Sequence, residues 1–444
     1  MIVDLSAPAN FSVNDGIDPN ICSLMYASVD NAVEFVLHLG RGTQLVKMDL
    51  KDAYRIIPIH PNDQHLLGIR WQDQVYVDRS LPFGLRSAPK IFTAFADMTA
   101  WAIHYRGVQF VMHYLDDFLL FGAPGSTEAT VAAALASEVF SHTGIPVATH
   151  KTEGPSTSVT FLGILIDTEL FQLRLPGEKL SRLRHLVASW RHKKSCTRKE
   201  LESLVGHLSH AATVIRPGRI FLRQLFALLS IASKSHYHIR LNAIVRADLQ
   251  WWLCFLQNWN GSSFFPPPIP SIHVYSDASG SFGCGAFDLS LGWFQLQWPT
   301  HWSLIIIAVK ELLPVVVAAS LWGRSWEGRH VCFHSDNMAV VSILNKRTAK
   351  EHLLNHYLRC IFFYAAFYKF HYSATHIPGT DNIAADALSR NNLPLFSLSV
   401  PQIPQFRVPP VTLDLVFQGM PDWSSAQWTD MFVRSLHTAS PPTL

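Results

Sequence analysis

The stretch HYLDDFLLFG, residues 113–122, places two adjacent carboxylates, Asp116 and Asp117, inside an otherwise apolar run. Apolar and aromatic residues flank the pair, and this pattern predicts two short strands with the acids at or near the connecting turn. Burying one carboxylate costs several kcal/mol, and a neighbouring like charge adds to that cost. The fold must therefore neutralise the pair by a Lys or Arg partner, by protonation or by a divalent cation.

The surrounding sequence favours the cation. Lys and Arg are absent between Gly107 and His142, so a basic partner has to come from a distant part of the chain. The strand-like segment LVKMDL (45–50) ends with Asp49, which supplies a third carboxylate. Asp49, Asp116 and Asp117 together predict a site for two Mg²⁺ ions, with Mn²⁺ able to replace them, and the chemistry implied is phosphoryl transfer.

Composition indicates a globular chain of several domains. The chain has 444 residues, of which 48% are hydrophobic and 16% charged. Its six cysteines are scattered without a CxxC pair, so neither a disulfide framework nor a zinc cluster is indicated. The N-terminus lacks the features of a signal peptide, and the apolar segment 304–323 contains Lys310, Glu311 and Pro314, which disfavour a membrane span. We expect an intracellular protein, cytoplasmic or nuclear, that is not secreted and has no transmembrane segment.

Proline-rich stretches at 264–270 and from residue 393 onward predict the domain boundaries. Between residues 171 and 223 the chain has twelve Lys or Arg against three acidic residues, within segments of helical periodicity. We therefore expect a fold of the α/β and α+β multidomain class. The predicted parts are an α/β unit (1–170), a basic helical unit (171–265), a second, mixed-sheet α/β unit (271–390) and a proline-rich tail (391–444). Tryptophans near residue 251 are predicted to pack in a core.

Five motifs in this order make the first unit similar to reverse transcriptases. They are the strand with Asp49, LPFGLRSAP (81–89), YLDD (114–117), Lys151 in HKTEGP and FLG (161–163). The sequences KMDLKDAYRIIPIHP and LPFGLRSAPKIF most resemble those of DIRS-type retrotransposons. The resemblance implies a palm with partial fingers, followed by a helical thumb and connection. It also implies RNA-directed DNA polymerase activity on an RNA template and a DNA primer, with deoxynucleoside triphosphates as substrates.

The resemblance also assigns roles to individual residues. Asp49 and Asp116 would hold the metals and Asp117 would complete the acidic pair. Tyr54 matches the position whose ring blocks the 2′-hydroxyl of an incoming nucleotide. Phe83, Gly84 and Arg86 would lie over the nucleotide and template, and Lys151 would face the leaving pyrophosphate. The basic unit would bind nucleic-acid phosphates through Arg182, Arg184, Arg191, Lys193, Lys194, Arg198 and Lys199, with further arginines at 216, 219 and 223.

A second acidic constellation follows the first proline stretch. Asp277 lies in a predicted strand, Glu311 in IIIAVKELLP, Asp336 where a strand ends and a helix begins, His376 in a loop, and Asp386 in a short helix capped by Thr380 or Asp381. This order resembles ribonuclease H, which implies that the four carboxylates bind two Mg²⁺ ions while the RNA strand of an RNA:DNA hybrid is cut, with His376 assisting. Taken singly, each acid could also be a surface or helix-capping residue. Pro314 would have to lie in the first turn of the helix carrying Glu311 or kink it.

Two alternatives remain open. Residues 1–45 contain a single Lys or Arg, Arg41, where the family's fingers supply basic residues, and IVDLSAP (2–8) resembles the second fingers segment with the preceding part missing. A ribonuclease H with an inactive polymerase half is thus one alternative. A non-catalytic, domesticated nucleic-acid-binding protein is the other, although it would have no need of two acidic clusters. The tail resembles the spacer and truncated start of a recombinase, and the oligomeric state is not fixed by the sequence.

Overall fold

The computed structural model describes residues 4–8, 10–231, 238–265, 269–347, 349, 351–410 and 412–413. The chain divides into two compact units, Met1–Arg174 and Leu175–Leu444, each described here by itself. The predicted mixed α/β multidomain class is confirmed, whereas the finer division into four parts stays a prediction. The recombinase-like segment predicted at the C-terminus lies largely outside the described residues.

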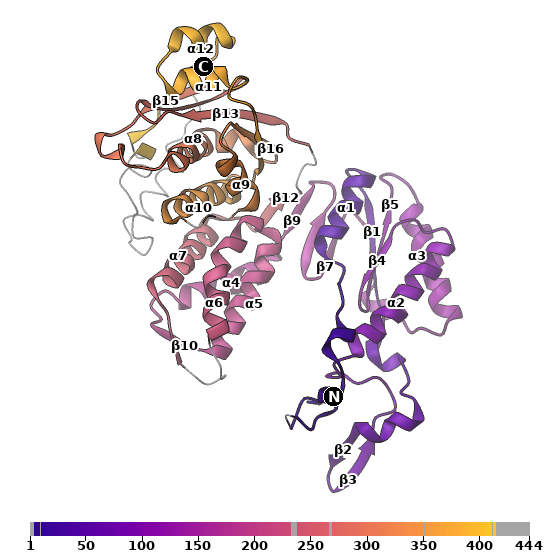
Figure 1. Cartoon of the computed structure of the whole chain (residues 1–444). Coiled ribbons are helices and arrows are strands. Elements are labelled where there is room, and N and C mark those ends of the chain that lie inside the picture. Colours follow the sequence, from indigo (N-terminus) through magenta and orange to yellow (C-terminus); the bar gives the residue numbers. More distant parts are fainter. Residues whose placement is uncertain are drawn as a thin grey trace. The chain divides into compact units, whose positions relative to one another are not determined.

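The first unit is organised around a four-stranded antiparallel sheet (Figure 1). Its strand order is β4 (Val111–Tyr114), β5 (Asp117–Gly122), β1 (Gln44–Asp49) and β6 (Glu153–Ser156). Three further strands, β7 (Ser158–Phe161), β8 (Ile164–Asp167) and β9 (Gln172–Arg174), pair antiparallel in chain order, and β2 (Gly68–Trp71) pairs with β3 (Gln74–Val77). The two strands predicted around the DD pair are thus β4 and β5.

Helices cover both faces of this sheet because its strands are apolar on both sides. Phe118 lies on the face covered by α2 (Ala88–Tyr105) and α3 (Glu128–His142), where its ring packs edge-on against Phe140 at 5.3 Å. Phe121 lies on the opposite face and packs against Phe35 of α1 (Val29–Leu39) at 5.2 Å. The sheet is therefore covered by helices on both faces.

The second unit begins with the helices predicted from the basic segment. They are α4 (Gly177–Ser189), α5 (Arg198–Val214), α6 (Arg223–Ile231) and α7 (Ala243–Asn258), with the short strands β10 (Ser195–Thr197), β11 (His238–Arg240) and β12 (Ser262–Phe264). Trp251 and Trp252 of α7 are buried, and the Trp251 ring stacks on Phe221 at 3.8 Å. This confirms that the tryptophans pack in a core.

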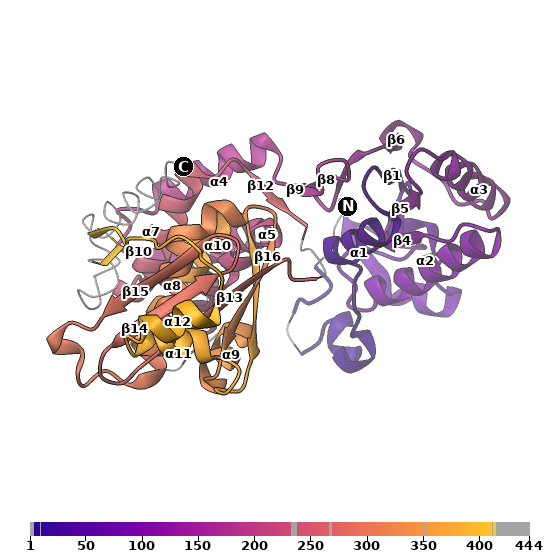
Figure 2. The ribbon, with the colours of Figure 1, turned by 90° about the horizontal axis from the view of Figure 1, so that it is seen from above.

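The remainder of the second unit is a five-stranded mixed sheet. Its order is β15 (Gly292–Gln297), β14 (Gly283–Asp288), β13 (Ile272–Ala278), β16 (His330–Ser335) and β17 (His371–His376). The pairs β13–β16 and β16–β17 are parallel and the others antiparallel. The helices of this part are α8 (Ile307–Trp322), α9 (Met338–Lys346), α10 (His352–Phe367), α11 (Ile383–Ser389) and α12 (Leu393–Ser399). Figures 1 and 2 show α8 and α10 on one side of β13 and α11 with α12 on the other.

One prediction about these helices is wrong, and one of the two alternatives for Pro314 is excluded. Pro314 lies in the interior of α8 rather than in its first turn, and buried packing on all sides of α8 tolerates the lost backbone donor. The N-cap of α11 is Asn382, not Thr380 or Asp381, and the buried Asn382 side chain instead donates to the Ser276 carbonyl at 3.1 Å. The apolar segment 304–323 is largely the core helix α8, and among the described residues no helix is both long and apolar enough to cross a bilayer.

Candidate functional site

The acids of the opening motif lie at the end of two paired strands. Asp117 begins β5 and stands opposite Asp49, the last residue of β1. Leu115 and Asp116 form the two-residue turn before β5, where the Asp116 carbonyl accepts the Leu50 amide at 2.9 Å. Leu115 has a φ of 51°, a left-handed conformation that costs a leucine of order 1 kcal/mol. The tight turn thus places three carboxylates at one edge of the sheet at a cost in backbone strain.

Burial makes these carboxylates hard to ionise. It raises the pKa of Asp117 to about 6, a rise opposed by Lys47 and reinforced by Asp116 and Asp49. Burial also raises the pKa of Asp116. Lys151 places its Nζ 2.9 Å from Asp49 Oδ1, and this hydrogen bond raises the pKa of the lysine. One of the neutralisers considered from the sequence, a distant lysine, is therefore present in the site, and burial makes protonation of Asp116 and Asp117 easier.

An aromatic wall stands beside the acids. Tyr54 is buried in a short 3-10 turn, Ala53–Ile56, and its ring packs against Phe83 at 5.1 Å and Phe92 at 5.3 Å. Burial raises the pKa of its hydroxyl, and Asp116 contributes to that rise, so the ring lies within electrostatic reach of the acidic pair. The tyrosine singled out from the sequence is therefore both a core residue and a neighbour of the carboxylates.

The LPFGL loop is tied to the N-terminal segment. Asn14, which is buried, donates to the Gly84 carbonyl at 2.9 Å and accepts from the Arg86 amide at 2.7 Å. The Arg86 guanidinium donates to the Ile17 carbonyl at 2.8 Å. Gly84 has a φ of 97°, which favours glycine. Arg86 thus anchors this loop, and Asn14 is a positioning residue with no local signal in the sequence.

The second constellation brings three acids together in the second unit. Asp277 on β13, Glu311 on α8 and Asp336 just after β16 each offer a carboxylate oxygen, and these oxygens all lie within 4.8 Å of one another. Asp277 and Glu311 are each only 5% exposed. The register explains the meeting, because parallel pairing aligns the carboxyl ends of β13 and β16 at one edge of the sheet.

Glu311 is the most perturbed member of this cluster. Burial raises its pKa to about 9, and the charges of Asp277 and Asp336 add to the rise. Its Oε2 atom is buried with no hydrogen-bond partner among the described residues. Burial also raises the pKa of Asp277, although a hydrogen bond from Ser389 opposes that rise. Three crowded carboxylates in this state form a ready binding site for a divalent cation.

The other two predicted members lie at the border of the cluster. Asp386 reinforces the rise in the pKa of Glu311, but its Oδ1 accepts from Arg390 Nε at 2.6 Å and it is not among the three acids in close contact. His376 is the last residue of β17 rather than part of a loop, and its Nε2 lies 3.1 Å from the Asp336 carbonyl oxygen. The exposed imidazole is thus placed beside the cluster but contacts backbone.

Comparison with known proteins finds a family similar to the segment that contains the first acidic cluster. Residues 12–166, about a third of the chain, match the family described as "Reverse transcriptase (RNA-dependent DNA polymerase)", and this segment contains Asp49, Asp116 and Asp117. Residues 12–166 are therefore similar to the reverse transcriptase family. The second acidic cluster lies outside this matched segment.

Each similarity to an individual protein covers only part of this chain and part of the related protein. Protein P of duck hepatitis B virus (strain China) is 23% identical over 190 residues, which are 43% of this chain and 24% of the viral protein. The genome polyprotein of Petunia vein clearing virus (isolate Shepherd) is 30% identical over 94 residues, which are 21% of this chain and 4% of the polyprotein. The chain thus spans about a quarter or less of the length of these relatives. A foamy viral protease-reverse transcriptase structure with ds DNA aligns with a TM-score of 0.48 and 17% identity, over 85% of this chain and 62% of that chain.

The basic residues that follow the matched segment divide into two groups. Three of the predicted phosphate ligands serve the fold: Arg184 donates to the Leu256 and Trp259 carbonyls, Lys193 pairs with Glu200, and Arg198 pairs with Glu202. The exposed group consists of Arg182, Arg191, Lys194 and Lys199.

The structure also reveals a basic pocket in which arginines predicted to bind phosphates at 216, 219 and 223 meet two that were not predicted to do so. It has a volume of about 430 Å³, and its lining includes five arginines that come from two distant segments, namely Arg216, Arg219, Arg223, Arg347 and Arg359. Arg359 pairs at 2.6 Å with Asp248, which is fully buried.

Proposed function

We propose that this chain is an RNA-directed DNA polymerase that also cuts the RNA strand of RNA:DNA hybrids, encoded by a retroelement of the DIRS type. The observation that carries the proposal is the pairing of Asp49 with Asp117 beside Asp116, inside a segment of the reverse transcriptase family. The second cluster, Asp277, Glu311 and Asp336, supports hydrolysis at a separate site. The DIRS assignment depends on the amino-acid sequences of residues 47–61 and 81–92.

The residues present fit Mg²⁺ at both sites. The donors are carboxylate oxygens, which Mg²⁺ prefers, and no sulfur or imidazole ligand is in the acidic group of the second unit. The buried, unpartnered Glu311 Oε2 is an atom that a cation would satisfy. When bound, paired Mg²⁺ ions would stabilise the attacking and leaving oxygens of an in-line displacement at phosphorus. Asp49 and Asp116 would hold them at the first site.

At the first site the chain's own residues bind and select the nucleotide. Tyr54 presents its ring beside the acids, where it would exclude a 2′-hydroxyl and so favour deoxynucleoside triphosphates. Phe83 and Gly84 would lie along the nucleotide and template, held by the Asn14 contacts to the loop. Lys151, which pairs with Asp49, would stand near the departing pyrophosphate and could give it a proton from Nζ.

At the second site the residues would release a proton, complete the group of carboxylates and assist departure of the cut RNA strand. Glu311 holds a proton at neutral pH and would release it when the cation-bound form assembles. Asp386 would turn from Arg390 to become the fourth carboxylate, which requires breaking a contact that is largely exposed and therefore weak. His376, at the exposed border of the cluster, would assist departure of the cut strand.

The exposed basic side chains would bind the duplex that the template and primer strands form. Arg182, Arg191, Lys194 and Lys199 lie on or next to α4 and α5, and contacts from such side chains to phosphates are independent of base sequence. The five-arginine pocket offers a second place where phosphates could bind. Binding through these groups should weaken steeply as salt is added.

The test uses a labelled RNA:DNA hybrid and a primed RNA template, each with Mg²⁺. We expect Asp336→Asn to abolish RNA cutting and preserve primer extension, and Asp116→Asn to do the reverse. Asp381→Asn, an exposed acid next to α11 and outside the cluster, is the matched control and should leave both activities intact. RNA cutting without primer extension would restrict the function to ribonuclease H. Hybrid binding with neither activity, unaffected by Mg²⁺, would indicate a non-catalytic nucleic-acid-binding protein.

A further inference from the structure

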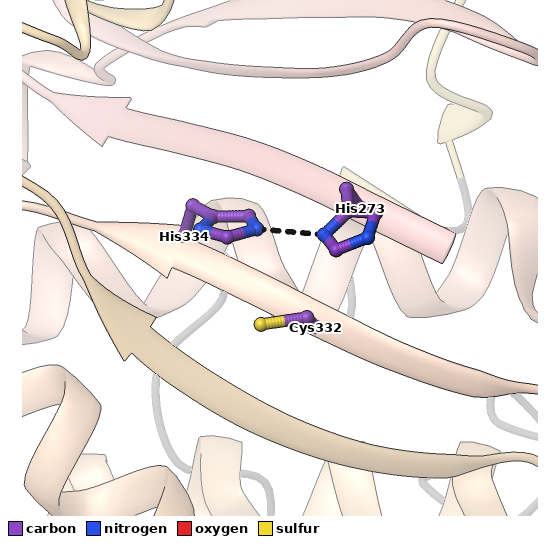
Figure 3. A group of neighbouring side chains, drawn as sticks. All are labelled: His273, Cys332 and His334. Atoms are coloured by element: carbon purple, nitrogen blue, oxygen red, sulfur yellow. Dashed lines mark hydrogen bonds between the residues drawn. The ribbon is translucent and has the colours of Figure 1, made fainter. Parts of the chain in front are cut away.

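A group of nitrogen and sulfur donors lies on the five-stranded sheet, apart from the acids. His273 on β13 is paired in parallel register with Cys332 on β16, and His334 follows two residues later on the same face of β16. One donor atom from each of the three residues lies within 4.8 Å of the other two. Figure 3 shows the side chains converging from the two neighbouring strands.

The contacts inside this group leave polar atoms poorly satisfied. His273 Nδ1 lies 3.0 Å from His334 Nε2, so two ring nitrogens face each other and only one proton fits between them (Figure 3). His334 Nδ1 is buried with no hydrogen-bond partner among the described residues. The Cys332 sulfur is buried and lies 3.2 Å from the Thr375 hydroxyl. Such an arrangement gains from a cation that accepts both nitrogen lone pairs and the sulfur.

We propose that His273, Cys332 and His334 bind a single transition-metal ion of the zinc class, with a water molecule as the fourth ligand. Zinc prefers imidazole nitrogen and thiolate sulfur in tetrahedral geometry, whereas Mg²⁺ takes oxygen ligands. Zinc–ligand bonds of about 2.0 to 2.3 Å place tetrahedral ligands about 3.3 to 3.6 Å apart. The two ring nitrogens would therefore need to separate by only a few tenths of an ångström.

The exposure of the group favours reversible loading from solution. His273 is exposed, so an ion can enter from the solvent side, while the buried Cys332 closes the opposite side. The spacing of the six cysteines gave no sign of this site, because its ligands come from strands that are far apart in the sequence and its thiol has no CxxC partner. Only the parallel register of β13 and β16 brings them together.

The position of the ion would matter for the acids on the same strands. Asp277 lies further along β13 from His273, and Asp336 directly follows the end of β16 beyond His334. An ion bridging His273 to Cys332 and His334 would join β13 to β16 by coordinate bonds. It would thereby hold in register the two strands that carry Asp277 and Asp336. The binding itself does not depend on either activity of the chain.

The test measures metal binding by the full-length protein after removal of bound metal with a chelator. Excess Mg²⁺ is present throughout to occupy the carboxylate clusters. We expect one Zn²⁺ per chain to remain after dialysis, and Co²⁺ to give the thiolate-to-cobalt charge-transfer band and tetrahedral visible bands. His273→Ala, at an exposed position that should not disturb folding, should weaken Zn²⁺ binding by more than about 100-fold, because even loss of an outer-sphere partner costs 10- to 100-fold. Cys332→Ser should remove the charge-transfer band.

Matched controls separate this site from other ligands. His330→Gln alters a histidine on the same strand that bonds Ser373 instead, and Cys22→Ser alters a partly exposed thiol in the first unit. Both variants, and Asp336→Asn, should bind Zn²⁺ as the unaltered protein does. Absence of the charge-transfer band from the unaltered protein would overturn the proposal, as would equal Zn²⁺ binding by His273→Ala.

Discussion

Replacing Glu311 with glutamine should stabilise the protein increasingly as the pH rises. The folded protein holds the pKa of Glu311 at about 9, against 4.5 for an unperturbed glutamate, because the carboxyl is buried beside Asp277 and Asp336. Below pH 4.5 the group is protonated in both the folded and unfolded states, so its titration does not affect stability. Above that pH the unfolded state loses its proton while the folded state retains it, so the free energy of unfolding falls.

The size of the effect follows from the pKa shift. Each pH unit between the unfolded and folded pKa values costs about 1.4 kcal/mol, so ionisable Glu311 should cost the folded state about 3 kcal/mol at pH 7. A neutral glutamine keeps the shape of the protonated form without this cost. The difference in unfolding free energy between Glu311→Gln and the unaltered protein should thus grow by about 3 kcal/mol from pH 4.5 to pH 7.

Urea unfolding in the absence of Mg²⁺, followed by tryptophan fluorescence at several pH values, measures this difference. Glu327→Gln is the control, because Glu327 is 56% exposed and lies in the same unit; its effect should be small and independent of pH. Addition of Mg²⁺ at 100 times its dissociation constant should raise the unfolding free energy of the unaltered protein by about 2.7 kcal/mol, and that of Glu311→Gln by much less. Parallel stability curves for Glu311→Gln and the unaltered protein across this pH range would refute the reasoning.

Three further changes test other parts of the molecule. Tyr54→Ala should lower the unfolding free energy by about 3 to 5 kcal/mol through loss of a buried ring and should raise ribonucleotide incorporation in primer extension, whereas Tyr54→Phe should do neither. Arg359→Met should lower the free energy of unfolding in urea by about 3 to 5 kcal/mol, because it leaves Asp248 buried and unpaired. Adding Asp248→Asn should recover part of that loss, and an equal loss in the double variant would contradict this account. Lys151→Met should raise the pKa of Asp116 and shift the acidic limb of the pH profile of primer extension to higher pH, and an unmoved profile would show that the lysine does not act on the carboxylate.

The acids could be placed from the sequence because their signals are local. A carboxylate at the end of an apolar strand, such as Asp49 or Asp336, is costly wherever the strand packs, and the cost itself marks the position. Two strands around the DD pair follow from the apolar and aromatic residues that flank it, and antiparallel pairing sets Asp117 opposite Asp49. Side-chain chemistry and the apolar flanks thus place these acids at strand ends, whereas their roles stay a prediction.

The partners of these acids could not be placed in the same way. Lys151 lies about a hundred residues from Asp49, and no periodicity connects them. Asp386 and Arg390, in contrast, stand four residues apart at a predicted helix, a spacing that by itself indicates an ion pair. The basic segment is correctly predicted as helical. Its number of charged residues, however, does not distinguish Arg184, which donates hydrogen bonds to two backbone carbonyls, from the exposed Arg182.

The raised pKa of Glu311 couples cation binding to proton release at the second cluster. At pH 7 the carboxyl is protonated, and a protonated oxygen cannot serve as an ionic ligand, so each binding event should release about one proton from Glu311. The apparent Mg²⁺ affinity at this cluster should therefore rise about tenfold per pH unit below pH 9. Titration calorimetry at pH 7 in buffers of different ionisation enthalpy counts the released protons. Burial disfavours the ionised form of Glu311, so a proton keeps the cluster compact until Mg²⁺ replaces it. A measured release of near zero protons per bound Mg²⁺ would contradict this coupling.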